Sequence, residues 1–198
     1  MIKLFGFGPH FGVRDPSPFV LKMDVFLRMM NLPFEVHNDA ANLRKAPKGK
    51  LPFVEYEGEN IADSSFIIRH IEAATGRSLN AHLSVEQRAT AEMVIKAIDE
   101  HFYWYLVHSR WTGSDTWPLV KQAFFGSLPF PLRVIVPIVA MRDVKSALNH
   151  QGVGRHSQEE VMVQAEEMLR SLAGLLGQYP RCGGLWPVGA VLRYRHGQ

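Results

Sequence analysis

Hydrophobic and polar positions in the first third of the chain change their spacing several times, and each change predicts a new element. Residues 2–7 form a short apolar run typical of a strand, and the Gly- and Pro-rich stretch after it predicts a long loop. Ser17-Pro18 has the form of a helix start, because Ser is a favoured N-cap and Pro suits the first helical position. Pro33 is expected to end that helix, and residues 34–38 alternate as a second, parallel strand would.

The pattern then predicts a hairpin and a further helix. Residues 51–56 regain strand character and are expected to pair with residues 60–62 across the turn at Glu57-Gly58. Asp63-Ser64 supplies an N-cap, with Ser64 expected to cap, for a helix over residues 65–74. The order βαβ, link and ββα is that of a thioredoxin-like α/β domain.

The second half has the spacing of helices. Ser84 and Gln87 have the form of a capping box, and the chain from there to about Trp111 has no Gly or Pro, which predicts one long helix. A second capping box at Ser157 and Glu160 begins another helix. We therefore expect four regions: a thioredoxin-like domain at 1–76, a linker at 77–83, an all-α domain at 84–179 and an atypical tail at 180–198.

Residues 122–141 approach the length and apolar character of a membrane-spanning helix, with Arg133 as their only charge. Pro129, Pro131 and Pro137 argue against a span, because each removes a backbone donor and strains the preceding turn. We interpret the segment as short buried pieces between helices. A role at a membrane surface is the minor alternative.

The amino-acid composition limits the kinds of partner, compartment and metal site that the sequence predicts. The 22 Lys and Arg residues against 19 Asp and Glu give a net charge of +3, and they are scattered, so no nucleic-acid partner is predicted. The single cysteine, Cys182, excludes an internal disulfide framework, and no secretory signal begins the chain, so we expect a cytoplasmic protein. His101 and His108 have no third ligand at a credible spacing, and no metal is predicted.

Three motifs at the predicted elements resemble the glutathione-binding half of glutathione transferases. They are Ser17-Pro18-Phe19, Gly49-Lys50-Leu51-Pro52 and Asp63-Ser64, each at the expected element and in the expected order. Three later stretches resemble the branch that includes metaxins and failed-axon-connections proteins: residues 99–104, 109–111 and 152–157. The resemblance covers about residues 1–178 and implies glutathione-transferase architecture.

The resemblance gives Ser17 the place of the family's Ser, Cys or Tyr, which hydrogen-bonds the sulfur of glutathione. A free thiol has a pKa near 8.5 and is mostly protonated at neutral pH. A hydroxyl donor at a helix N-terminus stabilises the thiolate and so raises the fraction of active nucleophile. The local sequence fits a simple helix cap equally well, and the resemblance favours catalysis.

The resemblance also implies the remaining glutathione contacts. Pro52 matches a proline that follows a cis peptide bond and leaves the backbone of Leu51 free to pair with glutathione, with Lys50 beside it. The thioredoxin-like fold alone would also require Pro52. Asp63 and Ser64 match the pair that holds the γ-glutamyl end, although capping explains them too. Phe102, Tyr105 and Trp111 are weaker candidates for lining a substrate pocket, because such aromatic stripes more often form core.

The resemblance implies a transferase that joins the glutathione thiol, as cosubstrate, to a small electrophile. The Ser at position 17 disfavours disulfide exchange, which needs Cys. The alternative that the metaxin-like resemblance suggests is a noncatalytic scaffold or membrane-associated interaction protein on the same fold. Pairing into a homodimer is a further expectation from the family.

The helical pattern fails from Pro180 onward, where the family places a Ser/Thr-x-x-Asp box and further core helices that this sequence does not contain. We expect a truncated or altered C-terminus that leaves an apolar face of the helical domain uncovered. The protein should then self-associate or melt without full cooperativity, as native mass spectrometry and thermal melting can measure. A monomer that melts cooperatively at an ordinary temperature would contradict this expectation.

Overall fold

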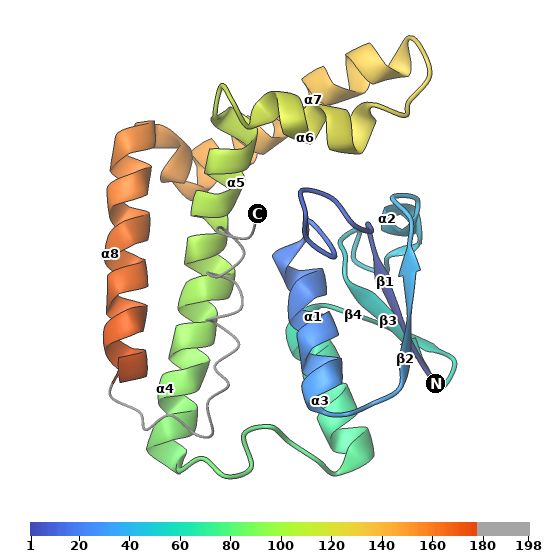
Figure 1. Ribbon diagram of the computed structural model, residues 1–198, viewed down its shortest axis with the longest axis vertical. Helices are drawn as coiled ribbons and strands as arrows, with labels where there is room; N and C mark the ends of the chain where they lie inside the picture. Colours follow the sequence, from blue (N-terminus) through green and yellow to red (C-terminus); the bar gives the residue numbers. More distant parts are fainter. Residues whose placement is uncertain (178–198) are drawn as a thin grey trace. The chain divides into compact units, whose positions relative to one another are not determined.

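A mixed four-stranded sheet organises the N-terminal part of the computed structural model, which describes residues 1–177. The strands lie in the order β2-β1-β3-β4 (Figure 1) and are β1 (Ile2–Gly6), β2 (Phe34–Asn38), β3 (Phe53–Tyr56) and β4 (Glu59–Ala62). β1 is parallel to β2 and antiparallel to β3, and β3 is antiparallel to β4. The predicted parallel pair and hairpin are therefore confirmed.

Three helices belong to this part, and the caps of α1 and α3 can be identified. They are α1 (Pro18–Met29), α2 (Asn42–Lys45) and α3 (Ser64–Thr75). α1 ends before Pro33: Asn31 is left-handed with φ 51°, and the Leu32 amide donates to the Leu27 carbonyl, as in a Schellman motif. The helix thus ends before Pro33, as predicted, and Asn31 supplies the left-handed residue at its end. The left-handed Gly76 ends α3 as predicted.

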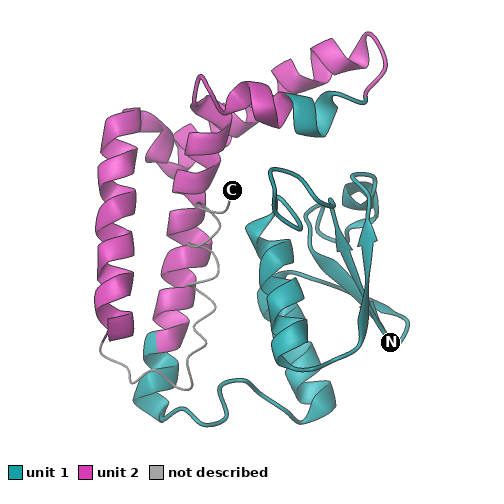
Figure 2. Ribbon diagram, in the orientation of Figure 1, with its two compact units in different colours: residues 1–90, 122–127 teal, residues 91–121, 128–198 magenta. Residues whose placement is uncertain are grey.

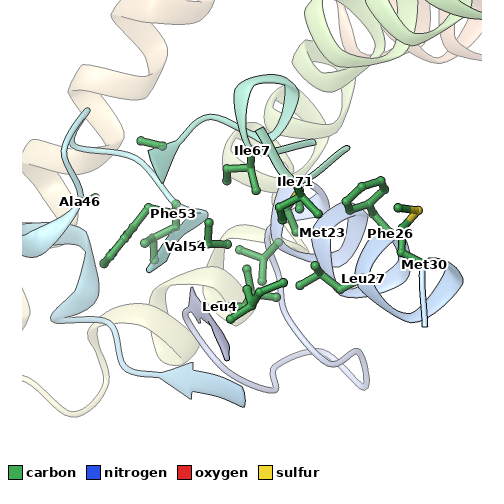
Figure 3. Packing of buried hydrophobic residues seen from close by; sticks show 14 residues of the cluster. Leu4, Met23, Phe26, Leu27, Met30, Ala46, Phe53, Val54, Ile67 and Ile71 are labelled. Carbon is green, nitrogen blue, oxygen red and sulfur yellow. The ribbon is translucent and has the colours of Figure 1, made fainter. Parts of the chain in front are cut away.

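The core of the first part lies between the sheet and helices α1 and α3 (Figure 3). Leu4 of β1 and Val54 of β3 are fully buried, and they share one cluster with side chains of both helices. The helical members with no exposed surface are Met23, Leu27, Ile67 and Ile71. Burial of the apolar faces of both helices is therefore what holds them to the sheet.

The second half is helical, as predicted. Its elements are α4 (Val85–Lys96), the π-helical stretch η1 (Ala97–Phe102), α5 (Tyr103–Thr112), α6 (Trp117–Phe125), α7 (Leu132–Gln151), the short 3-10 turn η2 (Val153–Arg155) and α8 (Gln158–Gly177). Both capping boxes form: the Gln87 amide donates to Ser84 Oγ, and the Glu160 amide to Ser157 Oγ, each at 3.2 Å. α4, η1 and α5 follow one another without a break, so the long helix predicted after Ser84 is present and contains a π-helical stretch.

The chain divides into two units, which Figure 2 colours separately. The first comprises residues 1–90 and 122–127, and the second comprises residues 91–121 and the described residues from 128 onward. The core of the second unit contains Tyr105, Leu148, Val153 and Val161. The predicted domain boundaries stay a prediction, and the predicted tail at 180–198 lies outside the described residues.

The segment at 122–141 corrects one prediction. Instead of short buried pieces, it contains the end of α6 and the first half of α7, which continues through Pro137. Proline removes one backbone donor, and the turns on both sides keep α7 intact. Several of its apolar side chains are exposed, among them Ile138 at 65% and Val139 at 51%. Within residues 1–177 no helix has both the length and the apolar character that crossing a bilayer requires.

A buried and an exposed leucine of the first unit together test the placement of the core. Leu4→Ala removes a side chain with 0% exposure and should lower the free energy of unfolding by about 2–5 kcal/mol. Leu43→Ala, at a site 42% exposed on α2, should change it by less than about 1 kcal/mol. Chemical denaturation of both variants measures the difference. Equal losses would contradict the placement of β1 in the core.

Candidate functional site

One end of the sheet collects the residues that the sequence predicted for glutathione. The register places Phe5 of β1 beside Phe53 of β3, and Phe53 beside Ala62 of β4. β1 therefore leaves the sheet at the end where β3 enters and β4 leaves. The loop to Ser17, the Lys50-Leu51-Pro52 segment and the Asp63-Ser64 pair all attach to this end of the first unit.

Ser17 is the N-cap of α1 and is partly exposed. Its Oγ accepts from the Val20 amide at 3.4 Å, which is long for a hydrogen bond, and its own amide donates to Asp15 Oδ1 at 2.8 Å. Accepting uses a lone pair of the hydroxyl and leaves its proton available for a donor role. Capping and donation to a sulfur are therefore compatible in one side chain.

The Lys50-Leu51-Pro52 segment enters β3 through a cis peptide bond between Leu51 and Pro52, as predicted. Leu51 and Pro52 are buried, whereas Lys50 is exposed. The segment precedes the first ladder residue of β3, Phe53. Its backbone thus lies at the strand entrance, where an added strand-like ligand can pair.

Asp63, and not Ser64, caps α3, which corrects the expectation for Ser64. The Asp63 carboxylate accepts from the Ser65 amide at 3.0 Å, and Ser64 is the first helical residue and is buried. Asp63 is exposed and has φ 78°, an uncommon value for a residue with a side chain. Such a conformation costs about 1–3 kcal/mol and is concentrated at binding sites in proteins.

Asp15 belongs to the same end of the sheet and was missed from the sequence. Its Oδ2 accepts from the amides of Phe7 at 2.7 Å and Gly8 at 3.0 Å, and its Oδ1 accepts from Ser17. Burial raises the pKa of Asp15, and the backbone hydrogen bonds and nearby His10 act in the opposite direction. An Asp two residues before a predicted N-cap was the available signal, because Asp commonly accepts from the amide two residues on.

Asn42 is a second buried polar residue that the sequence did not indicate. Its Nδ2 donates to the carbonyls of Gly6 at 3.1 Å and His37 at 2.8 Å. These bonds join the ends of the parallel strands β1 and β2. Asn42 therefore holds the backbone from which the loop toward Ser17 starts.

An aromatic cluster packs around Phe124, which lies on the part of α6 that belongs to the first unit. Phe7 meets Phe124 edge-on at 5.6 Å, and His10 stacks on it at 5.8 Å. Phe11 lies 6.2 Å from the same ring and is itself 43% exposed. This cluster borders the loop before Ser17, and the sequence alone did not connect its members.

The predicted pocket residues lie in the second unit. Tyr105 is 5% exposed, and its hydroxyl bonds to His101 at 2.6 Å and Gln164 at 2.9 Å. Phe102 packs beside it in the core, and Trp111 lies against Trp117 with ring centroids 5.5 Å apart. Their role in a substrate pocket stays a prediction.

His101 and His108 are the two residues that the sequence analysis considered as metal ligands. Residues 1–177 contain no group of three His, Cys, Asp or Glu side chains placed to hold an ion. His101 bonds to Tyr105, and His108 is buried with Nδ1 3.3 Å from Thr112 Oγ1. The two histidines thus have packing and hydrogen-bonding roles.

Comparison with known proteins finds similarity to glutathione S-transferases and to metaxin-2. The profile of the glutathione S-transferase N-terminal domain matches residues 18–116. Isoprene-epoxide–glutathione S-transferase from Rhodococcus sp. (strain AD45) is 31% identical over 188 residues, 91% of this chain and 78% of that protein. Failed axon connections from Drosophila melanogaster is 27% identical over 83% of this chain and 41% of its own length. Metaxin-2 from Homo sapiens is 25% identical over 81% of this chain and 61% of its own length.

A solved structure agrees with the fold. The beta-etherase from Sphingobium sp. strain SYK-6 has a TM-score of 0.56 and 20% identity, over 88% of this chain and 71% of that chain. At this identity the likeness shows the shared fold alone.

Gly6, the last residue of β1, has no room for a side chain beside Asp15. A Cβ there would lie 2.5 Å from Asp15 Oδ2 and 2.9 Å from Val20 Cγ1, so Gly6→Ala should lower the free energy of unfolding by about 1–3 kcal/mol. Gly174→Ala is the control, because open space surrounds that helical glycine and the change should stabilise by about 0.5–1 kcal/mol. Denaturation curves compare both variants with wild type. An unaltered Gly6→Ala curve would contradict the described packing of Asp15.

Proposed function

The chain belongs to the glutathione S-transferase superfamily, and from this premise we propose that it binds glutathione at the end of its sheet and conjugates the thiol to a small electrophile. The observation that carries the proposal is Ser17, a partly exposed hydroxyl at the N-terminus of α1 with its proton available. This placement suits a donor to a sulfur anion.

Ser17 and α1 would act together on the sulfur. The hydroxyl donates to it, and the positive end of the helix dipole favours the same negative charge. Both interactions stabilise the thiolate more than the thiol, so the pKa of the bound thiol falls below about 8.5 and more nucleophile is present at neutral pH. Bound glutathione supplies the sulfur that bonds to the electrophilic carbon, while the leaving group departs with the electron pair of the bond that breaks.

The other predicted residues would hold the tripeptide in place. The backbone of Leu51 pairs with it at the entrance of β3, and the exposed Lys50 offers a positive charge beside it. Asp63 takes the ammonium group, and Ser64 with the N-terminus of α3 takes the carboxylate. All four come from the end of the sheet that also bears Ser17.

The acceptor that fits best is a small epoxide or a comparable carbon electrophile. Support comes from the 31% identical relative, whose name states isoprene epoxide and glutathione as its substrates. In an epoxide the carbon–oxygen bond opens as the sulfur–carbon bond forms, and the oxygen takes a proton from solvent. A cytoplasmic location, the lack of a nucleic-acid partner and pairing into a homodimer remain predictions.

A second candidate is a noncatalytic scaffold built on the same fold. It is favoured by the two relatives whose names state no enzymatic activity, failed axon connections and metaxin-2. The fold itself does not separate the candidates, because one fold hosts many functions. Glutathione binding and turnover that depend on Ser17 are expected from the transferase alone.

Ser17→Ala should lower kcat for conjugation about a hundredfold, because one donor to the developing anion is lost. Affinity for glutathione should change much less, since the other contacts remain. The measurements are calorimetric titration with glutathione and steady-state conjugation of a small epoxide.

Ser157→Ala is the matched control, because it removes a serine N-cap in the second unit. It should cost about 1 kcal/mol of stability and leave kcat unaltered. A wild-type protein that neither binds glutathione nor turns over the epoxide would favour the scaffold. Turnover that is equal in wild type and Ser17→Ala would also refute the assigned role of Ser17.

A further inference from the structure

The carboxylate of Asp15 connects the end of β1 to the start of α1. One oxygen accepts from the amides of Phe7 and Gly8, which follow β1, and the other accepts from the amide of Ser17. The chain between these partners is a loop whose residues 11–14 are exposed. The shortest hydrogen-bonded connection between the sheet and Ser17 therefore runs through this one side chain.

A buried carboxylate such as that of Asp15 is uncommon and needs a physical explanation. Asp15 is 2% exposed, and an ionised group taken out of water is costly unless hydrogen bonds replace its hydration. Three backbone amides do so here, with donor–acceptor distances of 2.7, 3.0 and 2.8 Å. A side chain with a single acceptor oxygen could not reach both groups of donors at once.

The backbone near Asp15 also leaves room for its carboxylate. Gly6 leaves space that a Cβ would fill, since such an atom would lie 2.5 Å from Asp15 Oδ2. The carbonyl of the same Gly6 accepts from Asn42 Nδ2 and from the Asp39 amide. The strand end that Asp15 binds is thus itself fixed on its other side, so Asp15 links Ser17 to a rigid element.

We propose that Asp15 is a positioning residue that sets the direction of the Ser17 hydroxyl toward the sulfur of glutathione. The inference rests on the proposed function, because it assigns to Asp15 an effect exerted through Ser17. Without the bond to the Ser17 amide, the first turn of α1 keeps its apolar contacts with the sheet, such as those of the buried Val20, but loses the hydrogen bond that fixes the Ser17 backbone to the carboxylate at the end of β1. A shift of a fraction of an ångström there weakens an O–H···S hydrogen bond without removing any group that contacts glutathione.

The test is a double-mutant cycle on Asp15→Asn and Ser17→Ala. The carboxamide of Asn keeps one acceptor oxygen and turns an NH2 group toward the other set of amides, so one side of the connection is lost. The readouts are kcat, KM for glutathione, and the pKa of the bound thiol from the ultraviolet absorbance of the thiolate across pH. A purely structural role of Asp15 would not change the thiol pKa.

In the wild-type background Asp15→Asn should raise the pKa of the bound thiol and lower kcat by between about tenfold and about a hundredfold, with a smaller change in KM. In the Ser17→Ala background it should have little further effect on either quantity. Asp24→Asn is the control, since Asp24 is also buried on unit 1 but bonds to Arg28 instead, and both kinetic constants should stay as in wild type. If Asp15→Asn does not fold, Asp15→Glu, which keeps the charge and misplaces it by one methylene, enters the same cycle.

The outcomes distinguish a failure of the proposed function from a failure of the inference about Asp15. If Ser17→Ala leaves the thiol pKa unaltered, the role that the proposed function gives to Ser17 fails, and this inference fails with it. If Ser17→Ala raises that pKa while the Asp15 variant does not, the proposed function stands and this inference is overturned. An Asp15 effect that persists undiminished in the Ser17→Ala background would also overturn it, because Asp15 would then act independently of the serine.

Discussion

The pairing of β1 between β2 and β3 is the constraint on which the rest of the first unit depends. Because β1 is parallel to β2 and antiparallel to β3, one end of the sheet receives the exit of β1, the entrance of β3 and the exit of β4. A reversed or shifted strand would separate Ser17 from the cis-proline segment. The buried faces of α1 and α3 fix this register, since a one-residue slip would expose Leu4 and Val54.

Local signals made most of the fold predictable. Strand alternation, the Ser17-Pro18 start and the two capping boxes each depend on residues a few positions apart, and the structure contains all of them. Asp15 was not predictable in the same way. Two of its partners lie seven and eight residues away across an irregular loop, so its role depends on the path of that loop. Phe124 joins the first unit from still farther along the chain, which no periodic pattern can indicate.

The errors in the helical half also have physical causes. Pro137 was expected to break the chain into short pieces, yet α7 spans 20 residues and includes it, because local propensity is a weak prior. The residues of η1 include no Gly or Pro, so the sequence did not indicate a π-helical stretch there. A widened turn inserts into a helix without any composition signal, and such stretches are frequent near functional sites.

Family membership and the chemistry of the site depend on different observations. Membership follows from the profile match and a 31% identical relative, whereas the chemistry depends on whether one hydroxyl meets one sulfur. A crystal structure of the protein with bound glutathione tests this most directly. We predict the tripeptide along Leu51 with its sulfur within hydrogen-bond reach of Ser17 Oγ. Glutathione bound elsewhere, or a sulfur directed away from Ser17, would contradict it.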